Sequence, residues 1–228
     1  MGLTGSPWQS TWAETPTVLV VGDSLSAGYG IELDEGWVNL LQHRLQINHY
    51  PHQVINASIS GDTSRGGLAR LPAALDRYRP HLVILELGGN DGLRGLPLTA
   101  LKTNLAAMIE LCRAAGARVL LAEMRIPPNY GPVYSKKFQA LYGELAHQYD
   151  IPLIPFLLDG VAGHADLMQE DGIHPRAAAQ ARILDNVWPV VKTVLDAPGI
   201  PAKTSATMGR SRGEGILSWF EDFAVRSV

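Results

Sequence analysis

The chain has 228 residues and a formal net charge of −3, and its composition is 46% hydrophobic and 18% charged. These values argue against a disordered chain and against a nucleic-acid partner, so we expect a folded protein that acts on a small molecule. The single cysteine, Cys112, excludes an intrachain disulfide, and no apolar run reaches the roughly 18 residues that span a bilayer.

Short apolar runs rich in β-branched residues predict five strands. They occupy residues 17–21, 54–57, 82–87, 119–122 and 151–154. Most of these runs are continuous rather than alternating, which is typical of parallel strands that are covered on both faces.

The segments between the strands carry apolar residues at helical spacing. Four such helices contain Trp37, Leu68, Leu98 and Phe138. The third should end at Gly116, a glycine suited to the position just beyond a helix. A last helix should begin at Pro175, since proline is tolerated at the first helical position.

Alternating strands and helices predict a three-layer α/β/α fold with a mostly parallel, flavodoxin-like five-stranded sheet. We assign residues 17–196 to this domain and residues 1–16 to an N-terminal extension. Residues 197–228 should form a flexible C-terminal extension, because most of that segment is rich in Pro, Gly, Ser, Thr and Arg. Reactive groups are expected at the carboxyl ends of the strands.

Ser24 lies in the block Gly22-Asp23-Ser24-Leu25-Ser26, which follows the first predicted strand directly. The turn into a helix would expose it as a nucleophile, and the backbone N–H groups of that turn could hold part of an oxyanion hole. The alternative is that Ser24 is simply the N-cap of the helix, the commoner role for an isolated serine in this setting.

Asp171 and His174 lie three residues apart in Asp171-Gly172-Ile173-His174-Pro175. A serine hydroxyl needs a base within hydrogen-bond reach, and that base needs a partner that fixes its tautomer. His174 could be the general base of Ser24, with Asp171 orienting the imidazole. The alternative is that Asp171 caps the following helix while His174 packs in a loop.

Two further polar blocks follow the second and third strands. Gly61 lies in the first, where it would let the backbone approach a substrate closely, and Asn90 lies in the second, where its amide could donate to an oxyanion. Taken singly, both blocks are also explained by ordinary turn chemistry.

Taken together, Ser24, Gly61, Asn90 and His174 resemble in order and spacing the four signature residues of the GDSL, or SGNH, hydrolase family. The chain is most similar to the bacterial subgroup of multifunctional acyl-CoA thioesterase/protease/lysophospholipase enzymes and their arylesterase relatives. The blocks that carry this resemblance are Gly22-Asp23-Ser24-Leu25-Ser26-Ala27-Gly28-Tyr29, residues 56–64, Gly67-Leu68-Ala69-Arg70-Leu71-Pro72, residues 86–95, Pro128-Asn129-Tyr130-Gly131 and residues 171–175.

The resemblance implies a serine esterase or thioesterase that forms an acyl-enzyme on Ser24 and uses no cofactor or metal. The oxyanion would be held by the backbone N–H groups of Ser24 and Gly61 and by the side chain of Asn90. Its substrates would be small molecules: aryl or short-to-medium acyl esters, acyl thioesters or lysophospholipids. The oligomeric state stays open.

Two loops that should reach the site supply apolar surface for the acyl or aryl group. Their candidate residues are Leu93 and Leu96 in the first loop and Ile126 and Pro127 in the second. The alternative is that the apolar side chains of these loops only close the core.

Other readings of the sequence stay open. One is a carbohydrate acetylesterase of the same fold, and another is a module whose glycine-rich residues 22–30 bind phosphate or flavin at a helix start. That segment lacks the Lys-Ser/Thr ending of a P-loop and the G-x-G-x-x-G spacing. The resemblance implies a periplasmic location, whereas residues 1–16 lack the basic start and apolar stretch of a signal peptide.

Overall fold

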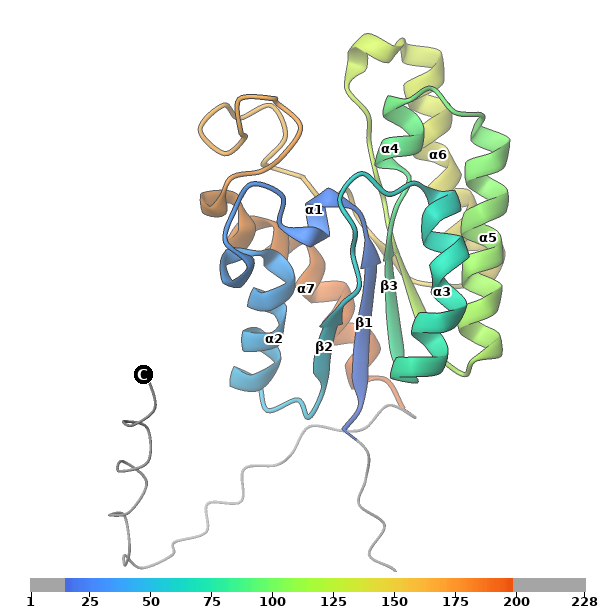
Figure 1. The fold of residues 1–228 in the computed structure, drawn as a ribbon, viewed down its shortest axis with the longest axis vertical. Helices are drawn as coiled ribbons and strands as arrows, with labels where there is room; N and C mark the ends of the chain where they lie inside the picture. Colours follow the sequence, from blue (N-terminus) through green and yellow to red (C-terminus); the bar gives the residue numbers. More distant parts are fainter. Residues whose placement is uncertain (1–14, 199–228) are drawn as a thin grey trace, which may run out of the picture.

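Five parallel strands form one sheet in the order β2-β1-β3-β4-β5 (Figure 1). A computed structural model describes residues 15–198 of the chain. The strands are β1 (Thr17–Gly22), β2 (Gln53–Asn56), β3 (Leu82–Glu86), β4 (Arg118–Ala122) and β5 (Leu153–Ile154). Both neighbours of β1 pair with it in parallel register, as do β4 with β3 and β5 with β4.

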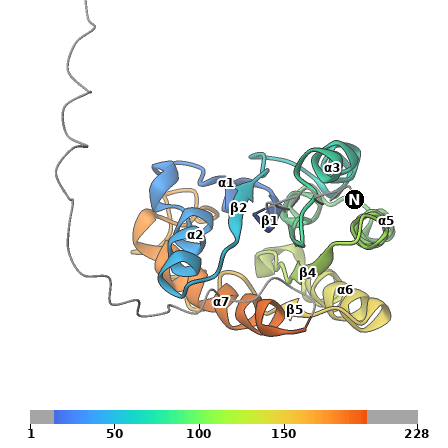
Figure 2. The same cartoon turned by 90° about the horizontal axis from the view of Figure 1, so that it is seen from below.

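Helices cover both faces of the sheet (Figure 2). On one face α2 (Trp37–Ile47) packs against α7 (Gln180–Asp196). The other face carries α3 (Ser64–Tyr78), α5 (Leu98–Ala114) and α6 (Pro132–Tyr149). Two short helices, α1 (Ser24–Ala27) and α4 (Gly89–Leu93), lie at the carboxyl edge of the sheet. This is the predicted three-layer α/β/α arrangement, with the flavodoxin-like strand order.

The continuous apolar runs of the sequence form the centre of the core. All five residues of β3 are buried, and so are the last five of β1, because helices lie on both sides of these strands. Trp37 from α2 and Phe138 from α6 fill the two helix layers and are fully buried. Burial of side chains of this size contributes about 1.5–3 kcal/mol each, so the core fixes the strands whose ends carry the site.

The last helix begins at Gln180, so the prediction that it starts at Pro175 was wrong. Pro175 instead forms an antiparallel bridge with Met168, and the neighbouring Arg176 has an extended backbone (φ −77°, ψ 168°). A single turn of 3₁₀-helix, η3 (Ala177–Ala179), then leads into α7. The β-bridge between Pro175 and Met168 thus overrides the preference of proline for a helix start.

Gly116 was correctly predicted to follow the end of a helix. It lies two residues beyond the last residue of α5 and has the left-handed backbone (φ 79°) that glycine adopts without strain. Two further short 3₁₀ turns, η1 (Leu33–Glu35) and η2 (Pro128–Tyr130), occur in loops.

The assignment of residues 1–16 and 197–228 to extensions stays a prediction. Residues 1–14 and 199–228, which make up nearly all of both segments, lie outside the described residues. Among residues 15–198, none of the helices has the length and apolar character needed to cross a bilayer.

Candidate active site

Ser24 is the first residue of α1, and only Asp23 separates it from the end of β1. The N-cap of this helix is Asp23, whose carboxylate Oδ1 accepts a hydrogen bond from the Leu25 N–H at 3.1 Å. The alternative in which Ser24 itself caps the helix is therefore wrong. Because Asp23 performs the capping, the Ser24 hydroxyl is available for other contacts.

Ser24, His174 and Asp171 form one chain of hydrogen-bonded groups. The Ser24 Oγ lies 2.9 Å from His174 Nε2, and the opposite ring nitrogen, Nδ1, lies 2.6 Å from Asp171 Oδ2. The residues come from opposite ends of the chain and meet where β1 ends. The sequence prediction that these three side chains lie together agrees with this geometry.

The backbone holds Asp171 in place. Its Oδ1 accepts hydrogen bonds from the N–H groups of Ile173 at 2.9 Å and His174 at 3.0 Å. Desolvation raises the pKa of Asp171, but hydrogen bonds from the His174 ring and from these two N–H groups, with the charge of His174, lower it further, to about 2. The carboxylate therefore stays charged at every pH near neutrality and can fix the imidazole.

Gln169 fastens the loop that carries His174 to the loop that follows α1. Its side-chain Nε2 donates to the carbonyls of Tyr29 at 2.8 Å and Pro175 at 3.0 Å. The ring of Tyr29 lies 4.4 Å from the His174 ring, centroid to centroid. The imidazole is thus oriented on three sides: by Asp171, by Ser24 and by the aromatic ring.

Gly61 lies in a tight turn beyond β2. The Asp62 N–H donates to the Ile59 carbonyl at 3.1 Å, and Gly61 occupies the third position of this turn with φ 78°, a backbone conformation that favours glycine. Among the described residues, neither the Gly61 N–H nor the Ser24 N–H has a hydrogen-bond partner. Both donors are therefore available to a developing negative charge.

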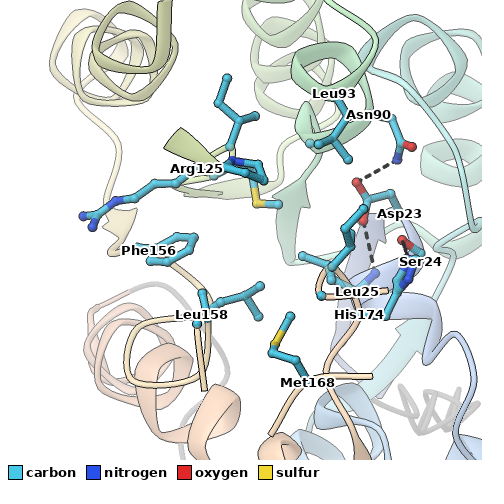
Figure 3. A pocket seen from close by; sticks show the side chains of 18 of the residues that line it. Asp23, Ser24, Leu25, Asn90, Leu93, Arg125, Phe156, Leu158, Met168 and His174 are labelled. Carbon is cyan, nitrogen blue, oxygen red and sulfur yellow. Dashed lines mark hydrogen bonds between the residues drawn. The ribbon is translucent and has the colours of Figure 1, made fainter. Parts of the chain in front are cut away.

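Asn90 lies in the first turn of α4, four residues beyond the end of β3. One hydrogen of its side-chain amide is engaged, since Nδ2 donates to Asp23 Oδ2 at 3.1 Å (Figure 3). The second hydrogen of that amide remains for an oxyanion. Asp23 thus orients Asn90 while it caps the helix of Ser24, a role that the sequence analysis missed.

A second buried carboxyl group lies beneath Asp23. Glu86 Oε2 accepts from the Ser26 hydroxyl at 2.6 Å and from the Asp23 N–H at 3.2 Å, and Glu86 is fully buried. Burial, and then the charge of Asp23, raise the pKa of Glu86 well above its ordinary value. Burial also raises the pKa of Asp23, to about 6, although its hydrogen bonds oppose the rise. Glu86 is therefore the member of the pair that keeps its proton.

An apolar cavity of about 600 Å³ opens beside Ser24 and His174. Leu93, Ile126 and Pro127 line it, as the sequence analysis expected. Leu96 does not, and it is 37% exposed. The cavity therefore does not support the prediction that Leu96 contacts the substrate.

Most of the remaining cavity wall was not predicted. Leu158 and Met168 come from the long connection between β5 and α7, together with Phe156 (Figure 3). Met124 lies two residues beyond the end of β4. Most of that connection has no periodic pattern, so the sequence offered no signal for its apolar residues. Met124 follows a predicted strand, and its position at the carboxyl edge was the one available clue.

The cavity also contains one basic side chain, Arg125. Its guanidinium lies 2.8 Å from Glu123 and 4.7 Å from the ring centroid of Phe156, and it points away from Ser24 (Figure 3). Within residues 15–198, no group of three or more His, Cys, Asp or Glu side chains could hold a metal ion. Apart from Arg125 and the polar groups around Ser24, the residues that line the cavity are mostly apolar.

A serine, an imidazole and a carboxylate joined in this way at the edge of a parallel α/β/α sheet are the arrangement of the serine hydrolases. The model of the GDSL-like Lipase/Acylhydrolase family matches residues 20–182. The chain belongs to this family.

Three similar proteins cover most of the chain. Esterase TesA of Pseudomonas aeruginosa is 55% identical over 183 residues, which are 80% of this chain and 91% of the relative. Thioesterase 1/protease 1/lysophospholipase L1 of Escherichia coli is 46% identical over 173 residues, 76% of this chain and 82% of the relative. The crystal structure of the psychrotrophic esterase EstA from Pseudoalteromonas sp., inhibited by monoethylphosphonate, has a TM-score of 0.76 and 45% identity, and the match covers 79% of this chain and 99% of that one.

Proposed function

We propose that the protein hydrolyses carboxylic esters and thioesters through an acyl-enzyme on Ser24. The observation that carries this proposal is the hydrogen-bonded chain from Ser24 through His174 to Asp171, next to an apolar cavity. The names of the two relatives, an esterase and a thioesterase/lysophospholipase, support the same reaction class.

In the acylation step, His174 Nε2 takes the proton of the Ser24 hydroxyl while Oγ attacks the acyl carbonyl carbon. Nδ1 keeps its hydrogen bond to Asp171, whose negative charge stabilises the imidazolium. The tetrahedral intermediate collapses when His174 returns the proton to the leaving alcohol or thiol. Water then attacks the acyl-enzyme, with His174 again taking the proton, and the carboxylic acid leaves.

Three donors would hold the oxyanion of each tetrahedral intermediate. They are the backbone N–H groups of Ser24 and Gly61 and the free amide hydrogen of Asn90. Each follows a different strand, β1, β2 or β3, and these strands are neighbours in the sheet. Removing one donor of this kind typically costs about 10²–10³ in kcat.

The cavity indicates the part of the substrate that the site selects. Its volume falls in the roughly 300–1,000 Å³ range of small-molecule sites, and beyond the catalytic groups its wall consists mainly of Leu, Ile, Met, Phe and Pro side chains. Such a wall suits an acyl chain or an aryl group better than a sugar, whose hydroxyls would lose their hydrogen bonds to water. This favours an acyl or aryl ester over the carbohydrate acetylesterase reading.

The test combines labelling with a substrate panel. Intact-mass analysis after fluorophosphonate treatment should show one adduct, which Ser24→Ala abolishes together with hydrolysis of p-nitrophenyl esters. Ser26→Ala is the matched control, because that hydroxyl contacts Glu86 and not His174; it should keep the adduct. A modified residue other than Ser24 would overturn the assignment.

The panel should contain p-nitrophenyl esters from acetate to palmitate, phenyl acetate and an acyl-CoA. It ranks ester against thioester and short against long acyl groups. Activity confined to acetylated sugars would contradict the proposed substrate class while leaving the serine chemistry intact.

A further inference from the structure

Arg70, on α3, contacts both loops that supply the backbone oxyanion donors. Its Nη2 donates to the Gly22 carbonyl at 3.2 Å, two residues before Ser24, and its Nη1 donates to the carbonyl of Ala57, just beyond β2. Its Nε lies 2.7 Å from Asp62 Oδ2, next to Gly61. The planar guanidinium group of Arg70 therefore connects the end of β1 with both ends of the loop of residues 57–63, which we call the Gly61 loop.

The Asp62 carboxylate extends this connection to the turn itself. Its Oδ1 accepts the Thr63 N–H at 3.0 Å, and its own N–H closes the turn on the Ile59 carbonyl. The following α3 leaves space for the carboxylate only because residue 66 is glycine: a Cβ there would lie 1.8 Å from Asp62 Oδ1. Two residues of α3 therefore accommodate the Asp62 carboxylate: Gly66 leaves space for it and Arg70 binds it.

The Gly22 carbonyl receives a second hydrogen bond from the Gly61 loop, donated by the Ile59 N–H at 3.1 Å. Arg70 therefore strengthens an existing connection between the loops of Ser24 and Gly61. The ion pair is largely removed from water, with 22% of the Arg70 side chain and 13% of the Asp62 side chain exposed. Because its charge is compensated by Asp62, Arg70 contributes mainly geometry rather than an electric field at the site.

We propose that Arg70 is a positioning residue for the oxyanion hole: it fixes the Gly61 N–H relative to the Ser24 N–H. The inference rests on the proposed function. The positioning role requires an arginine, because a lysine carries a single nitrogen and cannot bind three acceptors that lie around a planar guanidinium group. A misplacement of catalytic groups by 1 Å can cost about 10²-fold in rate, so the loss should reach this order.

The test compares Arg70→Lys with Arg77→Lys. Arg77 is an exposed residue of the same helix and contacts Tyr78, so it is a matched control. On a short p-nitrophenyl ester, Arg70→Lys should lower kcat by about 10- to 100-fold while KM changes less than about threefold, because Arg70 does not line the acyl cavity. Arg77→Lys should match the wild type in both constants.

A second readout separates positioning from a general structural defect. A trifluoromethyl ketone forms a reversible tetrahedral adduct, and its affinity should fall by the same factor as kcat/KM in Arg70→Lys. The affinity of a non-covalent competitor, the carboxylate product, should stay unchanged. Parallel loss of both affinities, or a kcat within twofold of the wild type, would overturn the proposal.

If Arg70→Lys does not fold, Asp62→Asn carries the test. The asparagine Oδ1 can still accept from Thr63, but its NH₂ group would face Arg70 Nε, so kcat and tetrahedral-adduct affinity should again fall together. A wild-type rate in Asp62→Asn would then overturn the proposal. Ser24→Ala is measured in parallel: hydrolysis that survives this change contradicts the proposed function, whereas a normal Arg70 variant with inactive Ser24→Ala contradicts only the positioning role.

Discussion

Replacing Asp23 with asparagine should stabilise the protein at neutral pH and impair catalysis. Burial raises the pKa of Asp23 from 3.8 to about 6. Between these two pH values the folded protein retains a proton that the unfolded chain has released, so the free energy of unfolding falls as pH rises through this window. Since one pKa unit corresponds to about 1.4 kcal/mol, the cost above pH 6 is about 3 kcal/mol.

Asparagine removes this cost without removing the helix cap, because Asn and Asp are about equally good N-caps. The stability of Asp23→Asn relative to the wild type should therefore rise by about 3 kcal/mol between pH 4 and pH 7.5, whereas the lost hydrogen bond to Asn90 lowers it at every pH. Activity should fall, because the NH₂ group of the new residue would face the Asn90 NH₂ group in place of an acceptor. Loss of that oxyanion donor would cost up to about 10²–10³ in kcat.

Urea unfolding at pH 4, 5, 6 and 7.5 measures the gain, with Asp76→Asn as control because it removes the same charge from an exposed site. The control should show no comparable gain between pH 4 and pH 7.5. If the gap between Asp23→Asn and the wild type is the same at all four pH values, the carboxylate does not carry the stated cost and the reasoning fails.

Three further outcomes follow from the site. Asn90→Ala should lower kcat by about 10²–10³ with little change in Tm, and a near-native rate would remove Asn90 from the oxyanion hole. Asp171→Asn should lower kcat by about 10⁴ through loss of the correct His174 tautomer, and a weak effect on kcat would assign the orienting role elsewhere. Because the pKa of Asp171 is about 2, the wild-type rate between pH 4 and 9 should show no step from this carboxylate. Ile126→Ala should shift preference in the ester panel towards longer acyl chains, because Ile126 lines the cavity. Ile47→Ala, at an exposed position on α2, should leave the profile unchanged. Equal profiles in the wild type and both variants would exclude Ile126 from contact with the acyl chain.

The sequence was sufficient to predict the sheet because its strands are short, continuous and apolar. The residues of β1 and β3 are buried on both faces, which explains why their sequences are almost continuously apolar. The start of α7 could not be predicted in the same way. Pro175 suits a helix start locally, but its pairing with Met168, seven residues earlier, is a tertiary contact that no local preference reports.

The meeting of Ser24, His174 and Asp171 was predictable because each of them stands in a short block at a strand end or before a helix. The supporting residues were harder to predict. Asp23 lies in the same block as Ser24, yet its contact with Asn90 joins residues 67 positions apart. Leu158 and Met168 lie in a connection with little regular structure, where apolar residues show no period that would assign them to a cavity rather than to the core.

The connection between β5 and α7 joins two tasks in one stretch of chain. Leu158 and Met168 line the apolar cavity, and His174 follows six residues after Met168. Met168 is also bridged to Pro175, the residue next to the imidazole. A substitution at Met168 that suits a new substrate will therefore tend to displace His174, whereas one at Ile126, on a different loop, will not. Chain-length preference in this protein should evolve, and be engineered, more readily from the Ile126 side.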